Sequence, residues 1–197
     1  MQGHVTGMGQ HYDMNLGGKL LIAMPGMADP RFAGAVILIC AYSGDGAMGL
    51  IINKPTPDLS FAGLLEQLKI PIAPKGRAIA VHFGGPVERG RGFVLHTTDY
   101  RVKGSTMDIA GGFGMTATQD ILSALGRGEG PVEALLALGY AGWGPGQLDT
   151  EIARNDWLTA DAPADLVFSP HDGEKWTGAL RRMGVDPLAL STVSGTA

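Results

Sequence analysis

The residues best suited to bind a ligand lie in and after a glycine-rich loop, residues 138–152. Four glycines surround Trp143 ahead of an expected helix. Gln147 and Glu151 follow four residues apart, so helical spacing places them on one face. Loops held by a rigid scaffold often carry function. We therefore predict that Trp143, Gln147 and Glu151 line a groove for a ligand or a partner. The alternative is that Trp143 only fills the core.

A second candidate stands where an expected strand reaches His82 and continues into Gly84, Gly85 and Pro86. Glycines let a backbone approach a ligand closely and expose its N–H groups. His82, Gly84 and Gly85 are therefore candidate binding residues. The alternative is a tight turn with positive φ, in which a backbone carbonyl satisfies His82.

Two further polar residues, Asn53 and His96, end other expected strands and complete the set of candidate binding residues. Folding could bring them together with His82 and Glu151 to form a dispersed catalytic site. Nucleophilic catalysis would need Ser, Cys or Thr beside a general base with an orienting third group, and the sequence contains no G-x-S-x-G motif. We therefore assign no catalytic residue.

The remaining chemistry-bearing patterns favour neither a metal nor a cofactor. Cys40 lies in the apolar run 35–41, where burial suppresses the thiolate, so we expect an inert thiol. Histidines and the cysteine are isolated in sequence, which argues against a metal site. Residues 44–49 match G-x-G-x-x-G, but β-branched residues follow instead of a helix, so a dinucleotide site is rejected.

The composition describes an ordinary folded protein. The chain has 197 residues, 45% of them hydrophobic and 17% charged, enough for one sizeable domain. Its net charge of −4 argues against direct binding of nucleic acid. A single cysteine favours the reducing cytoplasm, and the lack of an apolar run of about eighteen residues argues against a membrane span. We expect a cytoplasmic monomer or small homo-oligomer.

Apolar patterning predicts the elements that must position these residues. The expected strands are 20–24, 35–41, 48–53, 78–83, 92–96, 105–109, 132–140, 157–158 and 166–168, and a helix is the alternative for 132–140. The expected helices follow a cap at Ser60, follow a T-x-x-Q capping box at Thr116 and Gln119, begin at Pro145, and span 172–183.

The order of these elements indicates the fold class. Strands dominate the first half, and no regular strand–helix alternation follows, which favours α+β. The 31 glycines are spread along the chain and favour a sheet with many turns and bulges. We predict one domain over residues 14–197, preceded by a disordered N-terminal extension, residues 1–13.

Six motifs together resemble the YqgE/AlgH family of small bacterial proteins: residues 21–25, 46–55, 84–86, 91–96 and 139–148, and Trp176. The resemblance covers about residue 16 to the end of the chain. It implies a cytoplasmic α+β protein with a coiled, barrel-like β-sheet flanked by helices. The family is labelled as transcriptional regulators from an association with alginate production, and it supplies no agreed catalytic residues.

These observations leave three hypotheses for function. The first is a non-enzymatic binding or regulatory protein that acts through an unknown protein or small-molecule partner, and we favour it. The second is an enzyme built from Asn53, His82, His96 and Glu151. The third is direct nucleic-acid binding, which needs a basic recognition surface that the sequence does not suggest.

Overall fold

The computed structural model describes residues 15–193 and the side chains of residues 15–190. The predicted extension, residues 1–13, lies outside the described residues. The strands are β1 (Leu20–Ala23), β2 (Val36–Ser43), β3 (Gly46–Ile51), β4 (Ala80–Phe83), β5 (Val87–Thr97), β6 (Thr106–Ile109), β7 (Phe113–Thr116), β8 (Ala134–Trp143) and β9 (Trp157–Ala160). The helices are α1 (Phe61–Gln67), α2 (Gln119–Gly126), α3 (Gln147–Ala153), α4 (Ala164–Val167), α5 (Asp172–Arg182) and α6 (Pro187–Val193).

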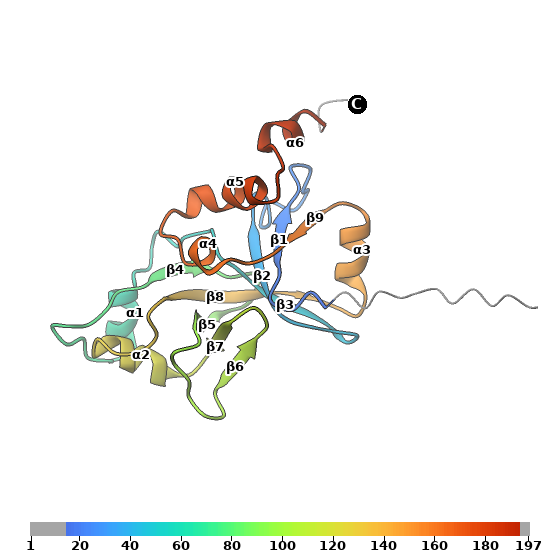
Figure 1. Ribbon diagram of the computed structural model, residues 1–197. Helices are drawn as coiled ribbons and strands as arrows, with labels where there is room; N and C mark the ends of the chain where they lie inside the picture. Colours follow the sequence, from blue (N-terminus) through green and yellow to red (C-terminus); the bar gives the residue numbers. More distant parts are fainter. Residues whose placement is uncertain (1–14, 194–197) are drawn as a thin grey trace, which may run out of the picture.

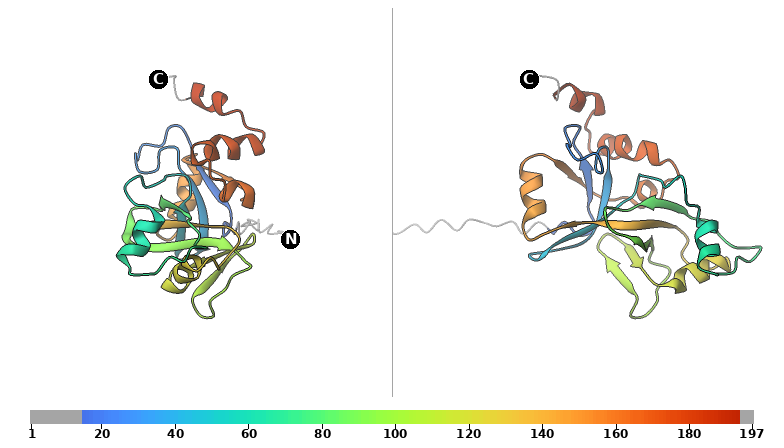
Figure 2. Two further views of the ribbon diagram at one scale, coloured as in Figure 1. Left: turned by 90° about the vertical axis from the view of Figure 1, so that its left-hand side faces the viewer. Right: turned by 180° about the vertical axis from the view of Figure 1, so that it is seen from behind.

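The nine strands form one curled sheet in the order β6-β7-β5-β8-β3-β2-β1-β9, with β4 also paired to β8 (Figure 1). Every pair is antiparallel except β4 with β8. The long strand β8 crosses the molecule from the end that carries α1 and α2 to the end that carries α3 (Figure 2). The predicted α+β fold, with a coiled, barrel-like sheet flanked by helices, is confirmed.

Strand β2 shows why the sheet is stable, because both of its faces are buried. Val36, Leu38 and Cys40 pack into a cluster that also holds residues of α4 and α5. Ile37 and Ile39 point to the opposite face and pack with residues of β8, α3 and β9. An unbroken apolar run is the pattern of such a doubly covered strand, as the sequence predicted.

The other end of the sheet is covered by α1 and α2. Phe61 and Leu65 of α1 pack with Ile121 and Leu125 of α2 against β4, β5 and β8. Ser60 caps α1, because its side-chain oxygen accepts a hydrogen bond from the Gly63 N–H at 3.0 Å. This cap is the one predicted from sequence. No helix in the described part of the chain is long and apolar enough to cross a membrane.

Several other predictions are confirmed. Residues 46–51 of the G-x-G-x-x-G region form strand β3 in a hairpin with β2, as the β-branched pattern predicted, and no helix begins there. Residues 132–140 fall mainly in strand β8 rather than in a helix. The helix predicted over 172–183 is α5, with Ala179 and Leu180 buried, but it is not the last helix, because α6 follows it.

A predicted helix cap and a predicted strand were wrong. Thr116 does not cap α2: it is a buried residue of β7, and Thr118 occupies the cap position without a side-chain hydrogen bond to the helix backbone. Residues 166–168 are not a strand, because the short helix α4 covers most of them. Both errors arise in short segments, where the apolar pattern contains too few residues to separate a helical period from a strand period.

Candidate functional site

A groove of about 870 Å³ lies between the end of β8, helix α3 and the segment 26–32. Trp143, Gln147 and Glu151 all line it. The structure therefore brings together the three residues that the sequence placed in one groove. Trp157, the first residue of β9, also lines it and was not among the candidates. Its only sequence signal was an aromatic residue six positions after Glu151.

Glu151 is the centre of a hydrogen-bond network in this groove. Its Oε2 accepts the indole N–H of Trp143 and that of Trp157, each at 2.9 Å. Its Oε1 accepts a side-chain N–H of Gln147 at 3.0 Å. The side-chain oxygen of Gln147, Oε1, in turn accepts a hydrogen bond from the Gly144 N–H at 3.0 Å. One carboxylate thus fixes both rings and the start of α3.

Trp143 fills the core and also faces the groove. It is 7% exposed and packs in the cluster beneath α3, which is the alternative that the sequence left open. Its ring meets Trp157 edge to face, with centroids 6.2 Å apart. The ring of Trp143 is buried, and its indole N–H is the group that takes part in the hydrogen-bond network of Glu151.

Helix α3 begins later than the sequence suggested. Pro145 is not in the helix: Gly146 is its N-terminal cap with φ of 70°, and the first helical residue is Gln147. A left-handed backbone suits glycine, so the glycine and not the proline sets this boundary. Asn155 follows the helix with φ of 62°, as expected for a residue that ends one. These two turns fix the direction in which Gln147 and Glu151 point.

His82 lies away from this groove, in a buried cluster with two residues of α5. Its Nε2 lies 2.9 Å and 3.0 Å from the two carboxylate oxygens of Asp172. The Nζ of Lys175 lies 2.9 Å from Asp172 Oδ1 and donates to the Ile52 carbonyl at 2.8 Å. The partner of His82 Nε2 is thus a carboxylate and not the backbone carbonyl of the alternative interpretation. Its Nδ1 is the single buried side-chain nitrogen or oxygen without a partner among the described residues.

Burial and pairing act in opposite directions on the pKa values of this cluster. Burial raises the pKa of the Asp172 carboxyl, but hydrogen bonds from His82 and Lys175 outweigh it, so the pKa lies below its ordinary value. Burial lowers the pKa of the Lys175 ammonium group, although Asp172 opposes this. The cluster fastens α5 to the sheet.

The backbone at Gly84 and Gly85 lies close to another strand of the protein and not to a ligand site. They carry the chain across β8, because β4 and β5 pair with β8 and the link between them passes over it. A Cβ on Gly85, where φ is 156°, would lie 2.0 Å from the carbonyl carbon of Tyr140. A Cβ on Gly84 would lie 2.3 Å from the Gly139 oxygen. The crossing explains both glycines without a ligand.

His96 and Asn53 each have structural partners. His96 is fully buried and bonds to the Thr97 carbonyl and to Thr116 Oγ1, each at 2.8 Å. Burial lowers its pKa, although the hydrogen bond to Thr97 opposes this shift. The Asn53 amide donates to the Gly34 carbonyl and accepts from the Val36 N–H. No hydrogen bond or ion pair within residues 15–190 joins His82, His96, Asn53 and Glu151.

Neither the thiol nor the carboxylates indicate a reactive centre. Burial raises the pKa of Cys40 to about 12, so the thiol is protonated at neutral pH. Among the described residues, no group of three or more His, Cys, Asp or Glu side chains could hold a metal ion.

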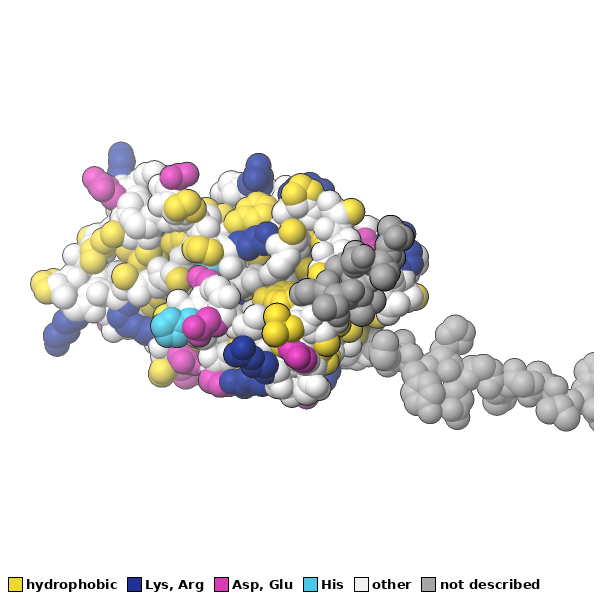
Figure 3. All heavy atoms as spheres, turned by 90° about the horizontal axis from the view of Figure 1, so that it is seen from above, with side chains coloured by type: hydrophobic (Ala, Val, Ile, Leu, Met, Phe, Trp, Pro, Cys, Tyr) yellow, Lys and Arg dark blue, Asp and Glu magenta, His cyan; other side chains and the backbone are white. Residues whose placement is uncertain are grey.

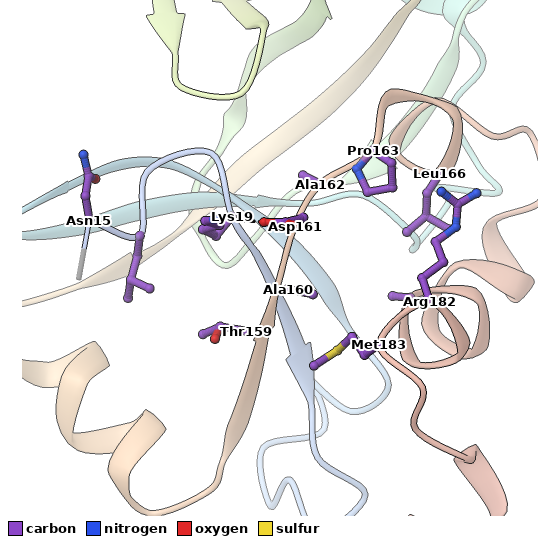
Figure 4. A pocket seen from close by; sticks show the side chains of 12 residues that line it. Asn15, Lys19, Thr159, Ala160, Asp161, Ala162, Pro163, Leu166, Arg182 and Met183 are labelled. Carbon is purple, nitrogen blue, oxygen red and sulfur yellow. Dashed lines mark hydrogen bonds and ion pairs between the residues drawn. The ribbon is translucent and has the colours of Figure 1, made fainter.

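A second hollow, of about 800 Å³, lies between β9, α4 and α5 (Figure 4). Its charged side chains are already paired. Lys19 bonds to Asp161 at 2.5 Å, and Arg182 pairs with Asp165. None of the residues predicted from sequence lines it. This hollow therefore presents no unbalanced charge to a ligand.

Charges of both signs are mixed on the face that carries α5 and α6. On the face that carries α5 and α6, Lys and Arg side chains are interspersed with Asp and Glu (Figure 3). The described side chains of this face form no continuous basic stripe. A duplex backbone attracts a protein through clustered cations, so this face does not suit it.

Comparison with known proteins places this geometry in a family. A model described as AlgH-like matches residues 20–188. A UPF0301 protein of Cereibacter sphaeroides is 68% identical over 184 residues, which cover 93% of this chain and all of the relative. A UPF0301 protein of Ruegeria pomeroyi is 56% identical over 185 residues, which cover 93% of this chain and all of that relative.

Two solved structures resemble this fold over most of the chain. The solution structure of the AlgH protein from Pseudomonas aeruginosa has a TM-score of 0.75 and 40% identity, with 96% of this chain and 98% of that one covered. The crystal structure of a Corynebacterium diphtheriae protein has a TM-score of 0.66 and 26% identity, with 91% of each chain covered. The fold, the matched motifs and these relatives show that the chain belongs to the AlgH-like family.

Proposed function

We propose that this protein is a non-enzymatic regulatory protein of the cytoplasm that binds a partner protein through the groove beside α3. The observation that carries the proposal is the network of Glu151, Trp143 and Gln147 on the groove wall. A carboxylate that is held by three donors is preorganised, and preorganised polar groups in a concave site provide specificity.

The other features of the molecule support a binding role. His82, His96 and Asn53 each have a structural partner, and no hydrogen bond among the described residues joins them in one site. Cys40 is an inert, reduced thiol, which suits the cytoplasm. A regulatory effect on transcription, which the family label suggests, would then act through the partner. The net charge of −4 and the mixed charges on the face that carries α5 and α6 support this indirect route.

The test is affinity capture from the cytoplasm of the source bacterium. Wild-type protein, Gln147→Ala and Glu151→Ala are compared as baits, with Glu174→Ala as the control, since Glu174 is exposed on α5. Nuclease-treated and untreated extracts are run in parallel. We expect a nuclease-resistant protein that both groove variants lose and the control retains. Equal capture by all four baits would contradict the proposal, and a nuclease-sensitive signal would favour nucleic-acid binding.

A further inference from the structure

The groove contains one carboxylate that forms no ion pair with a cation among the described side chains, residues 15–190. Two arginines and three carboxylates line it. Arg31 pairs with Asp29 at 2.7 Å, and Arg154 pairs with Asp156 at 2.9 Å. Glu151 is the remaining carboxylate. No ion pair joins it to a cation among the described residues, and its three hydrogen-bond donors are neutral indole and amide groups.

The network also leaves acceptor positions open beside this charge. A carboxylate accepts about four hydrogen bonds, two on each oxygen. The two indoles fill Oε2, and Gln147 fills one position on Oε1, so one position on Oε1 is open. The side-chain oxygen of Gln147, Oε1, accepts a hydrogen bond only from the Gly144 N–H among the described donors, so its second lone pair is open. Two neighbouring acceptors are therefore available to one ligand.

Apolar side chains line the same groove. Met27, Phe32 and Val87 lie along it, and Val87 is 37% exposed. An arginine side chain has an apolar stem and a planar guanidinium group with five N–H donors. The stem suits these walls, and the fork of donors suits two adjacent acceptors better than the single ammonium of lysine does.

We infer that the groove recognises an arginine side chain of the partner protein. Its guanidinium group donates to Glu151 Oε1 and to the side-chain oxygen of Gln147, Oε1. This inference rests on the proposed function, since it names the group that the partner inserts. The guanidinium supplies the positive charge that Glu151 lacks. The indoles and Gln147 hold the carboxylate in place before the ligand arrives, so little conformational freedom is lost on binding.

The test uses two small probes of equal size, N-acetyl-arginine amide and N-acetyl-citrulline amide. Citrulline keeps the stem and the planar end but has no charge. Binding is followed by NMR through the indole N–H signals of Trp143 and Trp157. The signal of Trp176, whose indole donates to the Ala23 carbonyl and which does not line the groove, is the reference.

We expect the arginine probe to shift the Trp143 and Trp157 signals more than that of Trp176, and the citrulline probe to bind about tenfold more weakly or not at all. Glu151→Gln removes the charge at nearly constant size. This variant should bind the arginine probe about tenfold more weakly than wild type does. Glu174→Gln removes an exposed charge outside the groove and should bind as wild type does. Equal binding of the two probes by wild-type protein would overturn the inference, and this comparison needs no variant to fold.

The two proposals can fail separately. A captured partner that depends on Gln147 but binds Glu151→Gln as tightly as wild type would overturn the arginine assignment and leave partner binding standing. Arginine-specific shifts without any groove-dependent partner would sustain the assignment and contradict the proposed function.

Discussion

His82 and Asp172 are ninety residues apart in sequence, yet the histidine Nε2 lies within 3.0 Å of both carboxylate oxygens. The pair joins β4 to the first residue of α5, and Lys175 completes the cluster from the next turn of that helix. A carboxylate between an imidazole and an ammonium group is held in its charged form, so its protonation opposes folding.

Stability should therefore depend on the Asp172 charge in a defined direction. The folded-state pKa lies below the ordinary value of 3.8, so the stabilisation is complete above that pH and is lost as the pH falls through the folded pKa. We expect Asp172→Asn to lower the free energy of unfolding by about 1–3 kcal/mol at neutral pH, because it removes the charge that Lys175 needs.

Urea denaturation of wild type and Asp172→Asn, from neutral to strongly acidic pH, measures this effect. The other carboxylates are common to both proteins and cancel in the comparison. The difference between the two curves should shrink as the pH falls below 3.8. A difference that stays constant across this range would contradict the role given to Asp172.

Cys40 should be almost unreactive in the folded protein. Because its pKa is about 12 and the ordinary value is 9.0, its thiolate fraction near pH 8 is about a thousandfold smaller than that of a free cysteine. Reaction with an aromatic disulfide reagent, followed by absorbance, should be slowed at least to that extent. The same reagent should label one thiol per chain rapidly in strong denaturant. Rapid labelling without denaturant would show that the strand opens readily.

The crossing over β8 should make Gly85 irreplaceable. A Cβ there would overlap the backbone of Tyr140, which cannot move without breaking strand pairs. We expect Gly85→Ala to destabilise the protein by more than about 4 kcal/mol or to prevent folding. Gly90→Ala is the matched control, because a Cβ at Gly90 has no heavy atom within 4 Å. Thermal unfolding monitored by circular dichroism separates the two. Similar midpoints for both variants would contradict the close crossing.

The helix caps give a smaller, graded prediction. Ser60→Ala removes the hydrogen bond to the Gly63 N–H and should cost about 1 kcal/mol. Thr118→Ala should change the free energy of unfolding by less than about 0.5 kcal/mol, since the Thr118 side chain makes no cap bond. Urea unfolding at one pH measures both. The cap assignment fails if the two substitutions have equal effects.

The elements that the sequence predicted well are those with a strong local signal. The apolar run of β2 and the capped, periodic α1 are both local patterns, and each has the expected burial. Helix α5 likewise has enough residues to show its period. Strand β7 has four residues and contains Gly114, so no pattern could mark it. A cap signal at Thr116 failed because burial beside His96 decides its environment.

The candidate site shows the same division. The spacing of Gln147 and Glu151 on one helix predicted their contact. The contribution of Trp157 depends on β9 returning beside β1, and the partner of His82 depends on α5 crossing β4. Such contacts arise from the order of strands in the sheet. Spacing along the chain does not encode that order.

Because β8 pairs with strands that are synthesised much earlier, the sheet cannot be completed until β8 has been synthesised. Strands β3, β4 and β5 all pair with β8, which spans Ala134–Trp143. A nascent chain that ends before residue 134 therefore exposes three strand edges at once, and exposed edges pair with other chains. Truncated products should aggregate, and ribosome stalling before this strand should recruit chaperones.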